Sequence, residues 1–350
     1  MTTHFSNKLL TWYGKHKRDL PWRDTKNPYF IWLSEIILQQ TRVNQGMPYY
    51  DKFVSTFPTI YDLAKADEEQ VLKLWQGLGY YSRARNLHFT AQYIVNELNG
   101  SFPNNYQELL KLKGVGDYTA SAIASFAYNE VTPTVDGNVY RVLSRYFGIK
   151  TSIDTPAAKK EFKELAFELI DPKNPADFNQ AIMEFGATHC TPKKPDCTTC
   201  IYSDSCIAFS KGEVSIFPYK KGKTKVRKRF FNYIVVQTKD HKTITNKRTQ
   251  KGIWQNLHEF PLIETDAKIE IKELLNNEVF KNLTTLKSFE LLSLHPKSSI
   301  HKLSHQHLHI KFWQLNVSDW ENAKSWKKTN LLPFPVVIHN FIKSQYGKFL

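Results

Sequence analysis

The stretch from Lys111 to Arg141 constrains the fold most, because it combines a glycine turn between two helical segments with a carboxylate, Asp136, soon after them. Apolar residues at helical spacing predict a helix over 106–112, and Gly114 and Gly116 end it, since glycine adopts tight turns that strain other residues. A second helix is predicted from Asp117, with the free N–H groups of its first turn beside the glycines. Such a helix start is suited to binding a phosphate. An ordinary αα-hairpin with Asp117 as the N-cap also fits these residues.

The four cysteines of the chain form a second constraint. They lie at Cys190, Cys197, Cys200 and Cys206, in the pattern C-x6-C-x2-C-x5-C. In a reducing compartment, clustered cysteines indicate metal ligation and not disulfide bonds. Four thiolates suit either zinc or a [4Fe–4S] cluster, and the spacing alone does not decide between them.

The charge balance indicates a polyanionic partner. The formal net charge is +15 at pH 7 and the isoelectric point is about 9.4, which favours nucleic acid or another acidic surface. No stretch approaches the roughly 18 apolar residues of a membrane span, and the N-terminus lacks the apolar core of a secretory signal. We therefore expect a cytoplasmic, DNA-associated monomer that does not enter a membrane.

Two further motifs accompany the glycine turn. LKGVGDYTA followed by VDGNVYRVLSR resembles the helix-hairpin-helix and Gly/Pro-Asp loop of the base-excision DNA glycosylase superfamily. LPWR together with WLSEIILQQT resembles the MutY-type, adenine-specific branch of that superfamily. The resemblance implies a mostly α N-terminal region with an iron–sulfur module, and it favours a [4Fe–4S] cluster over zinc. It also implies a smaller, Nudix-like α+β domain at the C-terminus.

These motifs divide the chain into three predicted regions. A helical catalytic region covers 1–210, with a six-helix module at about 28–135 and an iron–sulfur module formed by 1–27 and 136–210. The stretch 211–229 is dense in Lys and Arg, with Pro and Gly, and is predicted to be a linker. Alternating apolar residues in 230–350 predict short strands, among them 230–238 and 242–248.

Two carboxylates are the candidate catalytic groups. Glu35 lies beside an apolar helical stripe, where loss of hydration raises the pKa of a carboxyl group, so it can act as a general acid on a departing adenine. Asp136 can stabilise the cationic sugar that remains. The resemblance places both in these roles, with Tyr118 near them. Because bifunctional superfamily members carry a lysine where Tyr118 stands, no Schiff base is expected there.

The resemblance also implies a set of DNA contacts. Gly77 to Asn86 is predicted to be a glycine-framed loop that wedges into the duplex, with two arginines that hold phosphates. Lys193 and Lys194, between the first two cysteines, and the glycines of the hairpin are expected to contact the DNA backbone. The candidate base-recognition residues are Trp22, Arg23, Gln40, Thr41, Leu78, Tyr80, Gln180, Ser304 and His305.

The last two of these residues come from the C-terminal domain. GIWQNLHEFPL resembles a segment of the Nudix-like domain, and HKLSHQHL resembles the loop that contacts 8-oxoguanine, with Leu303 in place of a phenylalanine. No acidic REx2EE helix is present, so pyrophosphate hydrolysis is not expected.

The predicted function is a monofunctional glycosylase that removes adenine opposite 8-oxoguanine or guanine in double-stranded DNA. Two alternatives stay open: a bifunctional endonuclease III-like glycosylase/lyase, and a non-catalytic iron–sulfur protein that binds DNA.

Overall fold

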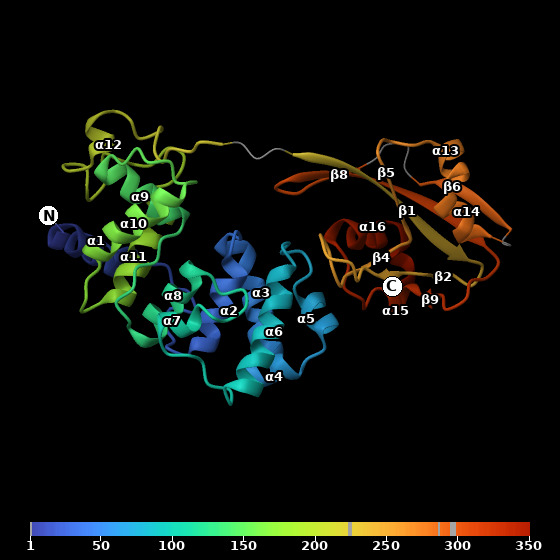
Figure 1. The fold of residues 1–350 in the computed structure, drawn as a ribbon, viewed down its shortest axis with the longest axis horizontal. Coiled ribbons are helices and arrows are strands. Elements are labelled where there is room, and N and C mark those ends of the chain that lie inside the picture. Colours follow the sequence, from blue (N-terminus) through green and yellow to red (C-terminus); the bar gives the residue numbers. More distant parts are fainter. Residues whose placement is uncertain (1, 223–225, 286–287, 295–298) are drawn as a thin grey trace. The chain divides into compact units, whose positions relative to one another are not determined.

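The computed structural model describes residues 2–222, 226–285, 288–294 and 299–350. The chain forms two compact units (Figure 1). The first unit comprises Met1–Lys65 and Asn86–Gly222, and the second comprises Ala66–Arg85 and Lys223–Leu350. A short piece from the first half of the sequence therefore belongs to the C-terminal unit. The predicted limits of the three regions stay a prediction.

The described residues of the first unit form helices joined by loops, with no strand among them. Its helices are α1 (Thr2–His16), α2 (Pro28–Leu38), α3 (Val43–Thr56), α4 (Ile60–Lys65), most of α6 (Ser82–Glu97), α7 (Tyr106–Leu109), α8 (Asp117–Tyr128), α9 (Gly137–Phe147), α10 (Pro156–Leu169), α11 (Pro175–Thr188) and α12 (Ile207–Ser210). None of the described helices in the molecule has both the length and the apolarity that crossing a membrane requires.

Local sequence explains where the helices that carry the site begin. The Asn27 side chain accepts a hydrogen bond from the Tyr29 N–H, and Pro28 occupies the first helical position of α2, as helix starts favour. Helix α9 is capped at its start by Asp136 and at its end by Gly148, which lies in the left-handed region. Apolar residues of α1, α9, α10 and α11 share one core, so the N-terminus packs with residues more than 130 positions away.

The hairpin forms as predicted, with two differences. Helix α7 ends at Leu109 and not at Leu112, because residues 110–113 already turn toward Gly114. Gly114 has a φ of +80°, which favours glycine, whereas Gly116 has a φ of −90° that any residue adopts. A Cβ atom at position 116 would meet nothing within 4 Å. Only Gly114 is therefore required by the turn, and Gly116 leaves open space beside the start of α8.

The second unit is built on a five-stranded sheet. The order is β5-β1-β8-β6, and β7 also pairs with β8. Strands β1 and β8 are parallel, and the other pairs are antiparallel. The sheet strands are β1 (Arg227–Thr238), β5 (Leu262–Thr265), β6 (Phe289–Ser293), β7 (Ser299–Lys302) and β8 (Gln306–Val317).

Short strands and helices complete this unit. The strand predicted over 242–248 is wrong as a single element, because its two ends pair with different partners, β2 with β9 and β3 with β4. These elements are β2 (Lys242–Thr243), β3 (Asn246–Lys247), β4 (His258–Glu259), β9 (Lys324–Ser325), α5 (Glu68–Leu74), α13 (Ile271–Asn276), α14 (Glu278–Thr284), α15 (Trp326–Thr329), α16 (Val336–Tyr346) and the 3-10 helix η1 (Gly347–Phe349).

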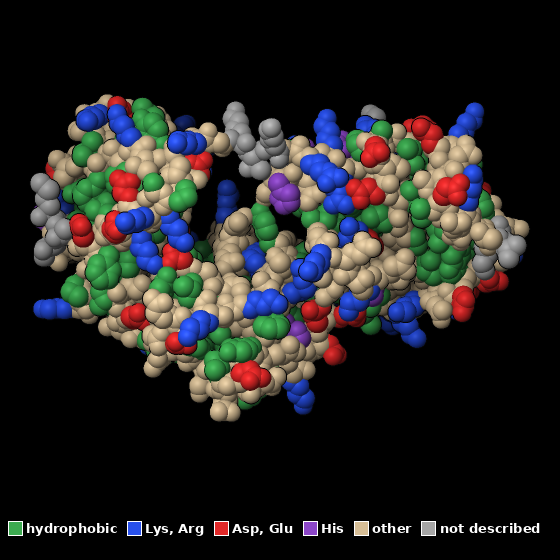
Figure 2. Space-filling model, in the orientation of Figure 1, with side chains coloured by type: hydrophobic (Ala, Val, Ile, Leu, Met, Phe, Trp, Pro, Cys, Tyr) green, Lys and Arg blue, Asp and Glu red, His purple; other side chains and the backbone are tan. Residues whose placement is uncertain are grey.

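Residues 66–85 are held to the C-terminal unit by polar contacts. The Lys73 ammonium donates to the carbonyl oxygens of Asn330 at 2.6 Å and Leu332 at 3.0 Å. Glu69 pairs with Lys247 at 3.0 Å. The Tyr81 hydroxyl donates to the Phe334 carbonyl at 3.3 Å. Lys and Arg side chains lie on the visible face of both units (Figure 2), as the net charge requires.

Candidate active site

Glu35 lies in the buried middle of α2. Apolar side chains surround it along this helix, and the residue is 7% exposed. Burial raises the pKa of Glu35 to about 7, and the negative charge of Asp136 adds to this shift, while a hydrogen bond with Tyr118 and the charge of Arg23 oppose it. A substantial fraction of Glu35 is therefore protonated near neutral pH, as a general acid requires.

Asp136 is the N-cap of α9. One of its carboxylate oxygens accepts the backbone N–H groups of Asn138 and Val139, each at 2.8 Å, and the other accepts the Asn138 side chain at 2.7 Å. Asn138 is held in turn by the Arg141 guanidinium at 2.8 Å. Burial raises the pKa of Asp136, and these hydrogen bonds oppose that rise. Asn138 and Arg141 were not predicted as site residues, although both lie within the VDGNVYR motif.

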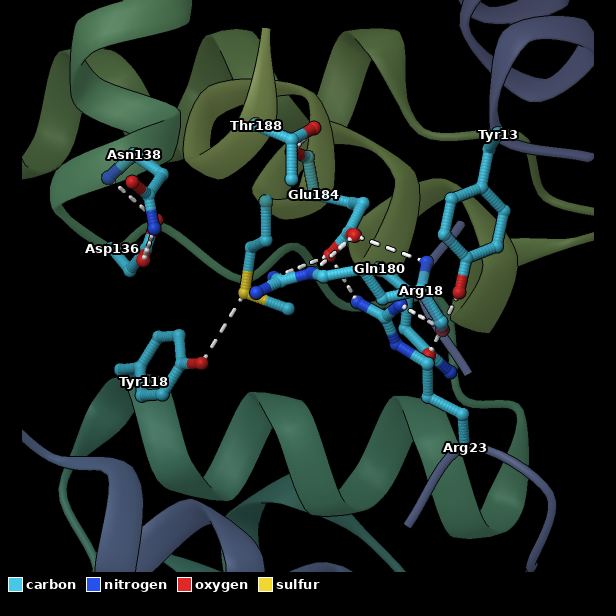
Figure 3. A network of polar contacts seen from close by, with 10 residues as sticks. Tyr13, Arg18, Arg23, Tyr118, Asp136, Asn138, Gln180, Glu184 and Thr188 are labelled. Carbon is cyan, nitrogen blue, oxygen red and sulfur yellow. Dashed lines mark hydrogen bonds and ion pairs between the residues drawn. The ribbon is translucent and has the colours of Figure 1, made fainter. Parts of the chain in front are cut away.

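Glu35, Asp136 and Tyr118 line one open pocket of about 780 Å³. The Tyr118 hydroxyl donates to the sulfur of Met183 at 3.2 Å, as Figure 3 shows. Burial raises the pKa of Tyr118 well above its ordinary value, and the neighbouring carboxylates add to the rise, so this phenol stays protonated. The pocket thus combines a protonated acid, an anchored carboxylate and a neutral hydroxyl. This is a combination that can protonate a leaving group and stabilise a cation.

Arg23, predicted to contact a base, takes part in a buried ion pair. Its guanidinium lies 2.6 Å from one oxygen of Glu184, and Arg18 lies 2.6 Å from the other (Figure 3). Burial alone would raise the pKa of Glu184, but the two arginines outweigh it and lower that pKa. The side chain of Glu184 is 1% exposed. Glu184 is therefore an internal carboxylate that holds Arg18 and Arg23 in place.

Two further predicted base contacts lie near this ion pair. Gln180 of α11 accepts a hydrogen bond from the Tyr13 hydroxyl at 3.0 Å and is buried, as is Trp22, whose ring packs against Tyr50. The remaining predicted contacts of this unit are at the surface. Gln40 is exposed with a φ of +56°, Thr41 is half-buried, and Lys193 and Lys194 are both exposed.

The second unit contains a separate cluster of predicted residues. Leu78, Tyr80, Ser304 and His305 line a pocket of about 660 Å³ that also includes basic side chains. Tyr80 has a φ of +46°, is 46% exposed, and its hydroxyl is hydrogen-bonded to that of Ser304. Ser304 and His305 form the turn between β7 and β8, closed by a bond from the Leu303 N–H to the Gln306 carbonyl at 2.8 Å. Two motifs more than 200 residues apart therefore meet in one site.

Arg83 corrects the prediction for the loop that carries Tyr80. Helix α6 starts at Ser82, so the predicted loop 77–86 ends at Tyr81, because its left-handed residues are confined to 77–80. Arg83 is 9% exposed, so little of its side chain is accessible to a phosphate. Its guanidinium lies over the rings of Trp75 at 4.9 Å and Tyr80 at 5.8 Å, and it donates to the Gly79 carbonyl at 3.3 Å. Arg83 therefore stabilises the loop from its buried side, and no local sequence pattern predicts its contacts with Trp75, Gly79 and Tyr80.

The four cysteines line a single cavity together with Arg145, whose guanidinium donates to the sulfur of Cys190 at 3.3 Å. All four are free thiols. Among the described residues, no three Cys, His, Asp or Glu side chains converge closely enough to hold one metal ion. Four thiols that line one cavity are a set of donors that a four-iron cluster or a structural zinc ion can use.

Comparisons with known proteins agree with this arrangement. Residues 33–167 match the family described as HhH-GPD superfamily base excision DNA repair protein, and residues 232–344 match the NUDIX domain. The chain is 38% identical over 333 residues to an adenine DNA glycosylase of Buchnera aphidicola, covering 93% of this chain and 92% of that protein. It is 45% identical over 215 residues to human adenine DNA glycosylase, covering 59% of this chain and 39% of the human protein.

A similar solved structure covers the helical part. It is that of a thermostable thymine-DNA glycosylase, with 33% identity and a TM-score of 0.56, covering 60% of this chain and 97% of that one. The expected helical glycosylase fold and the Nudix-like C-terminal domain are confirmed.

Proposed function

The chain belongs to the adenine DNA glycosylase family of the HhH-GPD superfamily, and from this premise we propose that it excises adenine from A:8-oxoguanine and A:G mispairs in double-stranded DNA. The product is an abasic site in an unbroken strand. The observation that carries this proposal is the pairing of Glu35, buried and with a pKa of about 7, with Asp136 in one pocket. Neither alternative from the sequence is favoured by the relatives.

The proposed reaction begins with an adenine extruded from the duplex. Glu35 donates its proton to the ring, at N7 in the family, while the glycosidic bond breaks, so the base leaves without a full negative charge. Asp136, anchored by backbone N–H groups, stabilises the positive charge that develops on the sugar. Tyr118 lines the same pocket as the two acids and stays neutral. Attack by water at the sugar then releases the abasic product.

Recognition is divided between the two units in this proposal. Trp22, Arg23 and Gln180 are proposed to contact the adenine, although they are not among the residues that line the pocket of Glu35 and Asp136. The ion pair of Arg18 and Arg23 with Glu184 holds Arg23 in place. Gln40, Thr41, Leu78 and Tyr80 lie beside the opposite base, with Tyr80 as the wedge. Ser304 and His305 contact 8-oxoguanine. The left-handed φ of Tyr80 supports the wedge, because such a conformation persists only when its surroundings enforce it.

The DNA backbone is proposed to bind at two places in the first unit. The free N–H groups at the start of α8, with Gly114 and Gly116 before them, hold one phosphate. The open space at Gly116 supports this, because it leaves room for a phosphate against the main chain. Lys193 and Lys194 are exposed and add positive charge from the cysteine loop.

Cys190, Cys197, Cys200 and Cys206 are proposed to hold a [4Fe–4S] cluster, with a structural role next to this basic loop. The cluster takes no part in breaking the glycosidic bond, which Glu35 and Asp136 account for. Iron and acid-labile sulfide in the purified protein, each near four per chain, are the expected result, whereas stoichiometric zinc would contradict it.

Single-turnover assays test the proposed function. Duplexes with adenine opposite 8-oxoguanine, guanine, cytosine and thymine are compared, and base release is scored by alkaline cleavage at the abasic site. Fast release opposite 8-oxoguanine, slower release opposite guanine and the slowest release opposite the other two are expected. Equal rates opposite all four partners would overturn the proposed specificity.

Borohydride trapping separates this proposal from a lyase. A monofunctional enzyme is expected to give no efficient covalent adduct with DNA during adenine release. Efficient trapping would favour the bifunctional alternative. Binding without base release, unaffected by loss of either carboxylate, would favour the non-catalytic alternative.

A further inference from the structure

A lysine pair of α10 borders the catalytic pocket, so the absence of a lysine at position 118 does not leave the pocket without amines. Lys159 and Lys163 line the same cavity as Glu35 and Asp136. They lie four residues apart, which places them on one face of the helix. Neither belongs to the motifs that carry the family resemblance.

Asp117 explains why these lysines matter. It is the first residue of α8, beside the N–H groups proposed to hold a phosphate. A carboxylate there repels a phosphate unless its charge is balanced. Lys163 lies 2.5 Å from one oxygen of Asp117, and the Tyr106 hydroxyl donates to the same oxygen at 2.5 Å. Lys163 and Tyr106 therefore fix the position of the Asp117 carboxylate, and the positive charge of Lys163 offsets its negative charge.

Lys159 is placed differently. Its nitrogen lies 3.5 Å from the other oxygen of Asp117, and its side chain is 64% exposed, against 32% for Lys163. Two lysines face the single carboxylate of Asp117, so the cluster of Asp117, Lys159 and Lys163 carries one net positive charge. The pocket wall has three carboxylic acids, Glu35, Asp117 and Asp136, so a DNA strand that enters it needs a cation at the edge.

We propose that Lys159 is a phosphate ligand at the mouth of the pocket, completing with the start of α8 a two-sided site for the strand that carries the extruded adenine. Lys163 neutralises Asp117 and does not contact DNA. This inference rests on the proposed DNA substrate. It assigns to the hairpin a partner from α10, so the strand is held from both sides of the sugar that reacts.

The salt dependence of binding tests this site in the full-length protein. Fluorescence anisotropy with a labelled duplex containing adenine opposite 8-oxoguanine gives Kd at several KCl concentrations, and Glu35→Gln is the background that prevents turnover. Each phosphate contact contributes about 0.9 to the log–log slope. Lys159→Ala is expected to lower the slope by about 0.9, and Lys159→Arg to restore it.

Lys160→Ala is the matched control. Lys160 is the next residue of α10, is 79% exposed and pairs with Glu164 at 3.9 Å, away from the pocket. Its loss removes the same charge but is expected to leave the slope unchanged. Equal effects of Lys159→Ala and Lys160→Ala would overturn the proposal, because they would show that binding responds to the overall positive charge of the protein and not to a contact made by Lys159.

A double variant excludes an indirect role through Asp117. If Lys159 acts only by neutralising Asp117, then Asp117→Asn with Lys159→Ala returns the slope to that of the parent, and the proposal fails. If Lys159 binds a phosphate, the double variant keeps the lower slope of Lys159→Ala.

Replacing single phosphates by methylphosphonates locates the contact. Lys159→Ala is expected to lose sensitivity at one phosphate adjoining the target adenosine and to keep it elsewhere. Uniform loss along the strand would contradict a discrete site. Because binding and base release are scored separately, a failure of adenine excision is distinguishable from a failure of the Lys159 site.

Discussion

The pocket of the first unit and the loop site of the second are built on opposite principles. Glu35 and Glu184 are buried and Asp136 is half-buried, and Asp136 and Glu184 are each held by two or more partners. Tyr80 and Ser304 are exposed at the tips of turns. Burial shifts the pKa of a carboxyl group, and general acid catalysis requires such a shift. Exposure leaves a hydroxyl free to exchange its present partner for a ligand.

This difference predicts which substitutions change rate and which change discrimination. Loss of a buried group should affect catalysis or stability strongly, because no solvent replaces its contacts. Loss of an exposed group should affect only the choice of opposite base. Four predictions test this division, in order of decreasing effect.

Glu35→Gln should produce the largest change. Removing the acid is expected to slow single-turnover adenine release by about a hundred- to ten-thousandfold, the usual range for general acid catalysis, with duplex affinity unchanged. Glu161→Gln, at an exposed position of α10, should match the parent in both measurements. If Glu35→Gln released adenine at a rate within a few-fold of the parent, the distinction between a catalytic pocket in the first unit and a recognition loop in the second would have no support.

Glu184→Gln should destabilise the protein next most. The substitution leaves Arg23 mostly buried and without its carboxylate, which should lower the free energy of unfolding by about 3 kcal/mol. This value is at the lower end of the range for broken buried ion pairs, because Arg18 is partly exposed. The measurement is the drop in melting temperature. Glu168→Gln, on the exposed side of α10, should change the unfolding free energy by less than about 0.5 kcal/mol. Equal melting temperatures for the two variants would contradict the prediction.

The pH dependence of base release should follow Glu35. Since the acid form is active and its pKa is about 7, the rate should level off below pH 7 and fall about tenfold for each pH unit above it, or roughly a hundredfold by pH 9. The sign follows from burial, which favours the protonated form. A rate that rises through this range would show that Glu35 acts as a base. Variants of the second unit should keep the same profile.

Ser304→Ala should have the smallest effect, and it should change the preference for the opposite base and not the chemistry of base release. Loss of one hydrogen bond, worth about 1 kcal/mol, is expected to reduce the preference for 8-oxoguanine over guanine about fivefold without altering the pH profile. Ser299→Ala, at an exposed position of the neighbouring strand, is the control and should keep the preference. A shifted pH profile in Ser304→Ala would mean that the two sites are not independent.

Local sequence was sufficient for the elements that carry the chemistry. The stripe around Glu35 and the glycine of the hairpin are each encoded by a few neighbouring residues, and α2 and α8 form there. Helix α9 and the N-cap at Asp136 were not predicted. The family resemblance then supplied the roles of these residues.

Contacts between distant segments were not predictable in this way. Glu184 meets two arginines more than 160 residues away, and Tyr80 meets Ser304 across 224 residues. Arg83 looked like a phosphate contact because a charged residue in a loop is usually exposed, yet the rings of Trp75 and Tyr80 cover it. Periodicity reports which face of a helix is buried, but not what covers it.

The inclusion of residues 66–85 in the C-terminal unit has a consequence for work with fragments. A protein expressed from the basic linker onward would lack helix α5 and the Tyr80 loop. It would keep the carbonyl groups of Asn330, Leu332 and Phe334 but lose Lys73 and Tyr81, which donate hydrogen bonds to them. Such a truncation would be a poor substitute for the intact C-terminal unit, and a graft that adds the missing twenty residues would be the sounder choice for isolating it.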